Sequence, residues 1–165
     1  MQAYDISGLN ILVLEKNVLI RRLLTDVFRE FGVPTVQSTA NVDAAFQMFC
    51  QFPVDIILSD WTYDLDGMEF LKKVRLDADS PNPFIPVIVI TANTEIRHVF
   101  EARDTGMTEY LAKPISAKLI YMRIISVIEN NRAFVRVNNF FGPDRRRRIG
   151  DKYIGSERRH HLTMH

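Results

Sequence analysis

The chain has 165 residues, of which 47% are hydrophobic, and its 21 Lys and Arg residues nearly balance its 20 Asp and Glu residues. This length suits one domain of about 100–150 residues with an extension and excludes two full hydrophobic cores. The single cysteine, Cys50, excludes an intrachain disulfide framework and a cysteine zinc site, which favours a cytoplasmic protein. The N-terminus lacks a secretory signal pattern, and no apolar run approaches the roughly 18 residues that span a bilayer, so we expect no membrane insertion.

The small net charge hides two regions of opposite charge. Residues 1–135 contain 13 Lys and Arg against 17 Asp and Glu, whereas residues 136–165 contain eight basic and three acidic residues. We therefore expect one domain over residues 1–130 and a basic, Arg-rich C-terminal extension over residues 131–165. About 30 residues are too few to bury an independent core.

Short apolar runs alternate with longer helical patterns over the first 130 residues. Strands that are covered on both faces lack polar alternation, and apolar residues at helical spacing mark the segments between them. In chain order, we predict strand Asn10–Leu14, helix Val18–Phe31, strand Thr35–Ser38, helix Asn41–Cys50, strand Val54–Ser59, helix Asp66–Leu76, strand Val87–Ile90, helix Glu95–Thr105, strand Glu109–Ala112 and helix Ser116–Asn130.

Glycine, proline and capping residues support several of these boundaries. Gly32 stops the first helix and Pro34 prevents its resumption, while Asp66 can cap the third helix and Gly106 can end the fourth. The first helix presents its apolar residues at helical spacing, namely Leu19, Leu23, Leu24, Val27, Phe28 and Phe31. Five successive strand–helix units predict an α/β fold with a parallel sheet covered by helices on both faces.

Polar residues follow four of the predicted strands where each strand ends, namely Glu15 and Lys16, Asp60, Thr91 and Lys113. Because ligands of open parallel sheets bind outside the carboxyl ends of the strands, we expect these side chains to share one edge. A carboxylate nucleophile, a hydroxyl, a cation and an acid that can hold a hard metal suit the transfer of an anionic group. Taken singly, a polar residue at any one of these positions is also typical of the place where a strand reaches solvent.

A series of spaced motifs over about residues 8–130 carries a resemblance to a known family. In chain order they are Ile11-Leu12-Val13-Leu14-Glu15, Leu58-Ser59-Asp60-Trp61, Asp66-Gly67-Met68-Glu69-Phe70-Leu71, Thr91-Ala92, Tyr110 and Lys113-Pro114. Together they resemble the receiver domains of two-component response regulators, of the chemotaxis type. The resemblance implies a doubly wound, flavodoxin-like fold with a five-stranded parallel sheet in the order 2-1-3-4-5.

The resemblance also implies a role for each residue of the site. Asp60 accepts a phosphoryl group from a histidine kinase or phosphotransfer protein, and Lys113 pairs first with that carboxylate and then with a phosphoryl oxygen. Thr91 turns to bind the phosphoryl group and Tyr110 follows inward, which alters the face formed by the fourth helix, fifth strand and fifth helix. The Lys113-Pro114 bond is a candidate for the cis isomer.

Mg²⁺ is the cofactor that the resemblance implies, with Glu15, Asp60 and the main-chain carbonyl of Thr62 as its ligands. The family's acidic pair is here Glu15-Lys16, and an ammonium at the second position repels a cation. Three interpretations remain. Glu15 holds the metal alone with extra waters, Lys16 itself neutralises the phosphoryl charge, or the domain is switched by binding rather than by phosphorylation. The loop between Asp60 and Asp66 is also one residue shorter than the family pattern.

The C-terminal extension contains an imperfect repeat, Phe141-Gly142-Pro143-Asp144-Arg145-Arg146 and Ile154-Gly155-Ser156-Glu157-Arg158-Arg159. Three interpretations of the extension remain. It is a solvated basic tail, its apolar–Gly units dock on the receiver surface of this chain or of a partner, or it binds nucleic acid or an anionic membrane. The last relies on its arginines, Arg145, Arg146, Arg147, Arg148, Arg158 and Arg159.

We therefore expect a stand-alone, cytoplasmic bacterial phosphoprotein of two-component, phosphorelay signal transduction. It accepts a phosphoryl group at Asp60 and signals by contact with a downstream protein, and the face of the fourth helix, fifth strand and fifth helix is the candidate surface for a homodimer. It catalyses only its own phosphorylation and dephosphorylation and is not a classified enzyme. The alternatives are an adaptor that acts without phosphorylation and a regulator that binds nucleic acid through its basic tail.

Overall fold

The computed structural model describes residues 4–62, 66–93, 95–138 and 140–144. Five parallel strands form one sheet in the order β2-β1-β3-β4-β5, which confirms the implied α/β fold and strand order. The strands of this sheet are β1 (Asn10–Leu14), β2 (Thr35–Thr39), β3 (Ile56–Asp60), β4 (Val87–Thr91) and β5 (Glu109–Ala112). The helices are α1 (Val18–Glu30), α2 (Val42–Gln51), α3 (Gly67–Leu76), α4 (Ile96–Thr105) and α5 (Ala117–Glu129).

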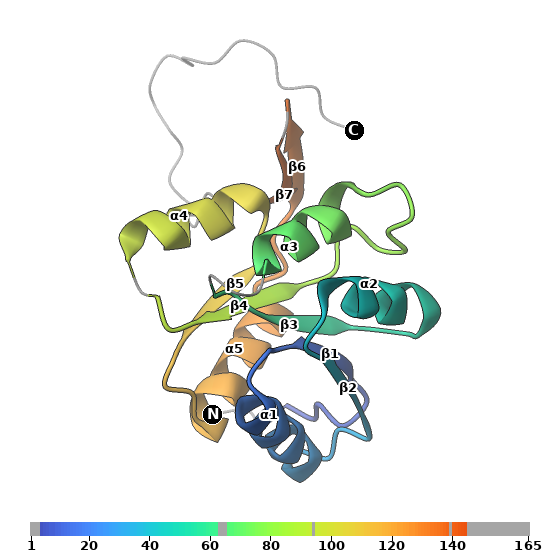
Figure 1. The fold of residues 1–165 in the computed structure, drawn as a ribbon, viewed down its shortest axis with the longest axis vertical. Helices are drawn as coiled ribbons and strands as arrows, with labels where there is room; N and C mark the ends of the chain where they lie inside the picture. Colours follow the sequence, from blue (N-terminus) through green and yellow to red (C-terminus); the bar gives the residue numbers. More distant parts are fainter. Residues whose placement is uncertain (1–3, 63–65, 94, 139, 145–165) are drawn as a thin grey trace.

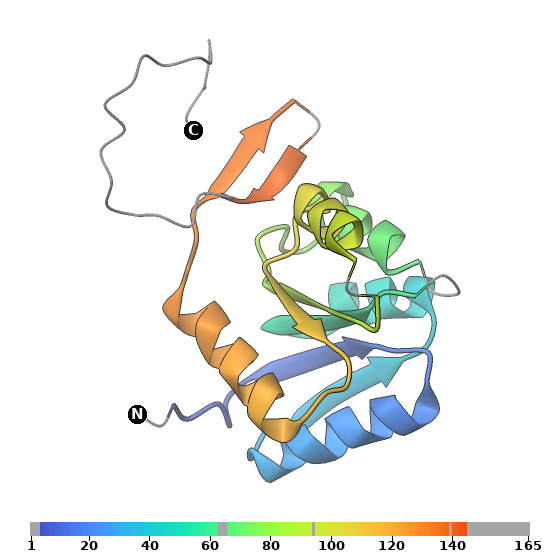
Figure 2. The same ribbon diagram turned by 90° about the vertical axis from the view of Figure 1, so that its left-hand side faces the viewer.

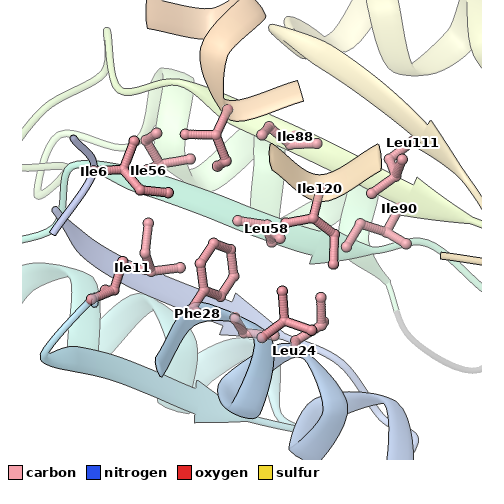
Figure 3. Packing of buried hydrophobic residues seen from close by; sticks show 14 of the residues in the cluster. Ile6, Ile11, Leu24, Phe28, Ile56, Leu58, Ile88, Ile90, Leu111 and Ile120 are labelled. Carbon is pink, nitrogen blue, oxygen red and sulfur yellow. The ribbon is translucent and has the colours of Figure 1, made fainter. Parts of the chain in front are cut away.

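Helices cover both faces of the sheet, with α1 and α5 on one face and α2, α3 and α4 on the other (Figure 1). Successive side chains of a strand point to opposite faces, so each strand contributes to two cores. Leu24 and Phe28 of α1 and Ile120 of α5 pack on one face against strand residues such as Leu58 (Figure 3). Phe49 of α2 and the buried apolar residues of α3 form the second core on the other face.

The apolar face of α1 is narrower than predicted. Leu24, Val27 and Phe28 are buried, whereas Leu19 is 73% exposed and Leu23 is 46% exposed. One stripe of α1 is enough to cover the sheet, so the neighbouring stripe that carries Leu19 and Leu23 stays in solvent.

Most predicted boundaries agree with the structure to within one or two residues. Gly106 ends α4 with a φ of 108°, as predicted, and the side chain of Asp66 caps α3 by accepting a hydrogen bond from the N–H of Glu69 at 2.8 Å. The third strand begins at Ile56 rather than Val54 and includes Asp60, because Asp60 pairs with Ile90 of β4.

A second, two-stranded sheet follows α5 and is not among the predicted elements. Strands β6 (Phe134–Val137) and β7 (Phe140–Pro143) pair antiparallel, and β7 contacts both α3 and α4. Figure 2 shows that the chain continues from the end of α5 to this hairpin, which lies on the side of the molecule that carries α3 and α4. Residues 141–144 of the first apolar–Gly unit therefore dock on the chain's own receiver surface, whereas the rest of that unit and the whole second unit lie outside the described residues. Among the described residues, no helix is long and apolar enough to cross a bilayer.

Candidate functional site

The carboxyl ends of β1, β3, β4 and β5 place Glu15, Asp60, Thr91 and Lys113 at one edge of the sheet. Glu15 and Asp60 are each 1% exposed and Thr91 is 2% exposed, although all three are polar. Buried polar groups are costly unless they are paired, so their partners decide what this cluster can do.

The ammonium of Lys113 lies between the two buried carboxylates. Its Nζ is 3.0 Å from Oε2 of Glu15, to which it donates a hydrogen bond, and 2.9 Å from Oδ1 of Asp60. The contact with Asp60 is an ion pair without the direction of a hydrogen bond, and no other described group donates to Oδ1. The Lys113-Pro114 bond that follows is cis, as the sequence analysis predicts.

One cation therefore serves two acids, and the pKa values of Asp60 and Lys113 reflect this imbalance. Burial raises the pKa of Asp60 above its ordinary value; Lys113 opposes the rise, and the charge of Glu15 adds to it. Burial alone would lower the pKa of Lys113, but its close contacts with the carboxylates of Asp60 and Glu15 outweigh burial and raise it. Asp60 is thus a buried carboxylate that shares one ammonium with a second acid, an arrangement suited to a nucleophile.

Main-chain packing brings the third helix close to Asp60. The helix begins at Gly67, and a Cβ at that position would collide with the main-chain carbonyl oxygen of Asp60. The Asp66 carboxylate thus caps the helix, and Gly67 is the residue type that lets the start of the helix lie this close to the main chain of Asp60.

The hydroxyl of Thr91 is turned to the main chain. It donates a hydrogen bond to the carbonyl oxygen of Trp61 at 3.0 Å and accepts one from the N–H of Asn93 at 2.9 Å. The hydroxyl of Tyr110 donates to the carbonyl oxygen of Asn93 at 3.3 Å, and burial raises its pKa. Thr91 and Tyr110 are thus joined through the segment that leads into α4.

The structure places Glu15, Asp60 and Thr62, the residues predicted to hold a metal, at the same edge of the sheet. The other carboxylate oxygen of Glu15, Oε1, accepts the N–H of Asn17 at 2.7 Å, and the side chain of Lys16 is exposed. Thr62 follows β3 at the same edge, while residues 63–65 of the shortened loop lie outside the described residues. In the part of the chain that the structure describes, no group of three or more His, Cys, Asp or Glu side chains is arranged to hold a metal ion.

One contact near the site was not anticipated from the sequence. The imidazole of His98 on α4 meets the ring of Trp61 edge-on, with centroids 5.9 Å apart and an interplanar angle of 90°. The helical pattern of α4 could not indicate which of its residues faces Trp61, because that depends on how α4 packs.

The tail arginines Arg145, Arg146, Arg147, Arg148, Arg158 and Arg159 lie outside the described residues.

Comparison with known proteins gives a consistent result. Residues 11–125 match the family model described as "Response regulator receiver domain". The chain is 25% identical over 130 residues to chemotaxis protein CheY-3 of Vibrio cholerae, covering 78% of this chain and 98% of that protein. It is 25% identical over 122 residues to chemotaxis protein CheY of Pseudomonas aeruginosa, covering 73% of this chain and 97% of the relative.

Solved structures share the fold. CheY4 of Vibrio cholerae superposes with a TM-score of 0.65 at 23% identity, covering 72% of this chain and 98% of that chain. The receiver domain of the histidine kinase CKI1 from Arabidopsis thaliana, complexed with Mg²⁺ and BeF₃⁻, superposes with a TM-score of 0.61 at 21% identity. That match covers 72% of this chain and 90% of the other.

Proposed function

The chain belongs to the response regulator receiver domain family, and we propose that it accepts a phosphoryl group on Asp60 from a histidine kinase or a phosphotransfer protein. The observation that supports this role is the buried carboxylate of Asp60, which lies 2.9 Å from the ammonium of Lys113. A structural ion pair would use one acid for one base, whereas here a second acid, Glu15, contacts the same ammonium. The pocket therefore holds more negative charge than stability requires.

This geometry supports the following transfer. A carboxylate oxygen of Asp60 attacks the phosphorus of a phosphohistidine, an oxygen–phosphorus bond forms and the phosphorus–nitrogen bond breaks, so that the imidazole leaves with its electron pair. Lys113 then pairs with a phosphoryl oxygen, which it can do without leaving Glu15 because its Nζ already contacts both acids. The chain is in this respect a phosphoacceptor that promotes its own modification, rather than an enzyme with a separate substrate.

The donor set fits a weakly held hard cation. Oδ1 of Asp60 accepts no well-directed hydrogen bond among the described residues. The carboxylates of Asp60 and Glu15 lie close enough together to contact the same ammonium, that of Lys113. Mg²⁺ is typically bound by one or two carboxylates and keeps several waters. Glu15, Asp60 and the carbonyl of Thr62 would hold it, and the ion would supply positive charge against the phosphoryl oxygens. Lys16, exposed beside Glu15, is the residue that would weaken this site.

The signal would leave the site through Thr91 and Tyr110. To reach a phosphoryl group on Asp60, the Thr91 hydroxyl gives up its hydrogen bond to the carbonyl of Trp61. That change acts on Asn93, which Tyr110 also contacts, and hence on the start of α4. We expect a downstream protein or a second copy to read the face of α4, β5 and α5, where Phe100 and Met122 are exposed.

Phosphorylation by a small donor tests this function. The protein is incubated with acetyl phosphate and Mg²⁺, and intact mass is measured for the wild type, Asp60→Asn and the control Asp43→Asn, which removes an exposed carboxylate on α2. We expect an acid-stable, base-labile gain of one phosphoryl group in the wild type and the control but none in Asp60→Asn. No gain at high donor and metal concentrations would overturn the proposal and leave an adaptor that acts without phosphorylation.

A further inference from the structure

The hairpin β6–β7 is held to the receiver by a close contact between two glycines. A Cβ on Gly142 of β7 would lie 2.7 Å from the Cα of Gly106, and a Cβ on Gly106 would lie 2.8 Å from the carbonyl oxygen of Phe141. Gly106 also has a φ of 108°, a conformation that favours glycine. The backbone of β7 thus touches the point where α4 ends, and no side chain fits between them.

Aromatic rings and a buried arginine complete the docking surface. Phe84, Phe134 and Phe141 form a cluster with ring centroids 5.2 to 5.5 Å apart. Arg75 of α3 is 2% exposed and lies 5.1 Å from the centroid of Phe134. Its guanidinium donates hydrogen bonds to the carbonyl oxygens of Gly106, Pro83 and Ile85 at 3.0, 2.9 and 2.7 Å, respectively. The hairpin therefore covers the guanidinium of Arg75, which holds the end of α4 through its hydrogen bond to Gly106.

The segment before the hairpin is also attached. Arg132 lies 3.4 Å from the carboxylate of Glu109 on β5, and the N–H of Asp144 donates a hydrogen bond to the carbonyl oxygen of Ala133 at 2.7 Å. The hairpin is consequently part of the folded body rather than a flexible appendage on α5.

Helix α4 itself is loosely held. Of its ten residues, all of them described, only Ala102 is buried, and no side chain caps its N-terminus. An element with few buried contacts moves at low cost, so the contacts at its two ends determine where it lies. At its start are Asn93 and the contact between His98 and Trp61, both linked to Thr91 beside Asp60. Gly106 and the hairpin lie at the other end of α4. A helix of ten residues is about 15 Å long, so the two ends are about that far apart.

We propose that the hairpin β6–β7 is a clamp on α4 that opposes activation at Asp60. The docked hairpin favours the arrangement in which Thr91 contacts the carbonyl of Trp61, and occupation of Asp60 by a phosphoryl group loosens the hairpin. The Gly106–Gly142 contact leaves no space for α4 to move toward β7, and movement away from β7 separates the two backbones. Because the coupling between two sites is reciprocal, release of the hairpin strengthens binding at Asp60 by the same factor by which binding at Asp60 favours release of the hairpin. This inference rests on the proposed phosphoacceptor function.

The full-length protein is tested with beryllofluoride and Mg²⁺ as the phosphoryl mimic. Hydrogen exchange of the amides in residues 134–143 is measured with and without the mimic, and we expect exchange at least fivefold faster when it is bound. Mimic affinity is then measured by the fluorescence of Trp61 for the wild type and Gly142→Ala, whose new Cβ must push β7 off Gly106. We expect Gly142→Ala to bind the mimic at least threefold more tightly. Gly8→Ala is the matched control, because a Cβ there meets nothing within 4 Å.

Each failure has a separate meaning. If the mimic binds and hairpin exchange is unchanged or slower, the clamp is wrong while the phosphoacceptor function stands. An unchanged affinity in a folded Gly142→Ala whose hairpin exchanges faster also overturns the clamp. If the mimic does not bind to the wild type and acetyl phosphate does not phosphorylate it, both proposals are wrong. The exchange measurement on the wild type decides the matter even if Gly142→Ala does not fold.

Discussion

The ammonium of Lys113 lies 3.0 Å from Oε2 of Glu15, so the acid that follows β1 is already paired with the lysine that follows β5. Two residues 98 positions apart in the chain thus share the pocket of Asp60. Among the described residues, Lys113 is the only cation in contact with Asp60, and Glu15 shares it. The ion pair therefore does not fully offset the cost of burying the carboxylate, and the pKa of Asp60 is raised.

Replacing Lys113 by Met should destabilise the protein at neutral pH. Two buried carboxylates would lose their shared cation, and we expect the free energy of unfolding to fall by about 3 kcal/mol at pH 7. The loss should shrink toward pH 4, where the carboxylates can protonate. Urea unfolding at both pH values measures this, with Lys118→Met on the exposed side of α5 as the control. A loss of equal size at both pH values would instead indicate a packing defect.

Asp60→Asn should stabilise the fold at neutral pH. Because the pKa of Asp60 is raised in the folded state, its ionised form lowers stability above that pKa, and the penalty disappears below the unfolded-state pKa of about 3.9. We expect a gain of about 1 kcal/mol at pH 7 that shrinks toward pH 4 and vanishes below it. Thermal unfolding of both proteins across this range measures the effect, and Asp43→Asn should change stability by less than about 0.5 kcal/mol. A gain that does not depend on pH would contradict this explanation.

Lys16→Asp should strengthen metal binding. The change removes a positive charge beside Glu15 and supplies an oxygen ligand, so we expect Mg²⁺ affinity to rise at least about tenfold. A titration followed by the fluorescence of Trp61, the only tryptophan and the residue after Asp60, measures it. Lys72→Asp makes the same charge change on exposed α3 and should have little effect. An unchanged affinity for Lys16→Asp would show that the pocket differs from the metal site of the family.

Arg75→Met should weaken the attachment of α4 and the hairpin. The carbonyl oxygens of Gly106, Pro83 and Ile85 would lose their donor, and we expect a loss of about 3 kcal/mol in the free energy of unfolding. Urea unfolding measures the loss, with Arg29→Met on the exposed side of α1 as the control. A loss below about 1 kcal/mol would mean that water replaces the guanidinium without cost.

The sequence alone was sufficient for the five β–α units, for the ends of most elements and for the residues that gather at the carboxyl edge of the sheet. Apolar periodicity, Gly106 and the capping residue Asp66 act over a few neighbouring residues, so they can be read locally. Once the sheet is known to be parallel, Asp60, Thr91 and Lys113 must end at the same edge.

Only the tertiary structure decided how Glu15 shares Lys113 with Asp60, how His98 meets Trp61, and that β6 and β7 pair as a hairpin. Strands β6 and β7 are four residues each and are held by Arg75, Phe84 and Gly106, which lie far from them in the chain. An isolated hairpin of this size is marginal in water, so its own sequence carries little signal. The energy that stabilises it comes from contacts between distant segments, and those exist only after the sheet and α4 have folded.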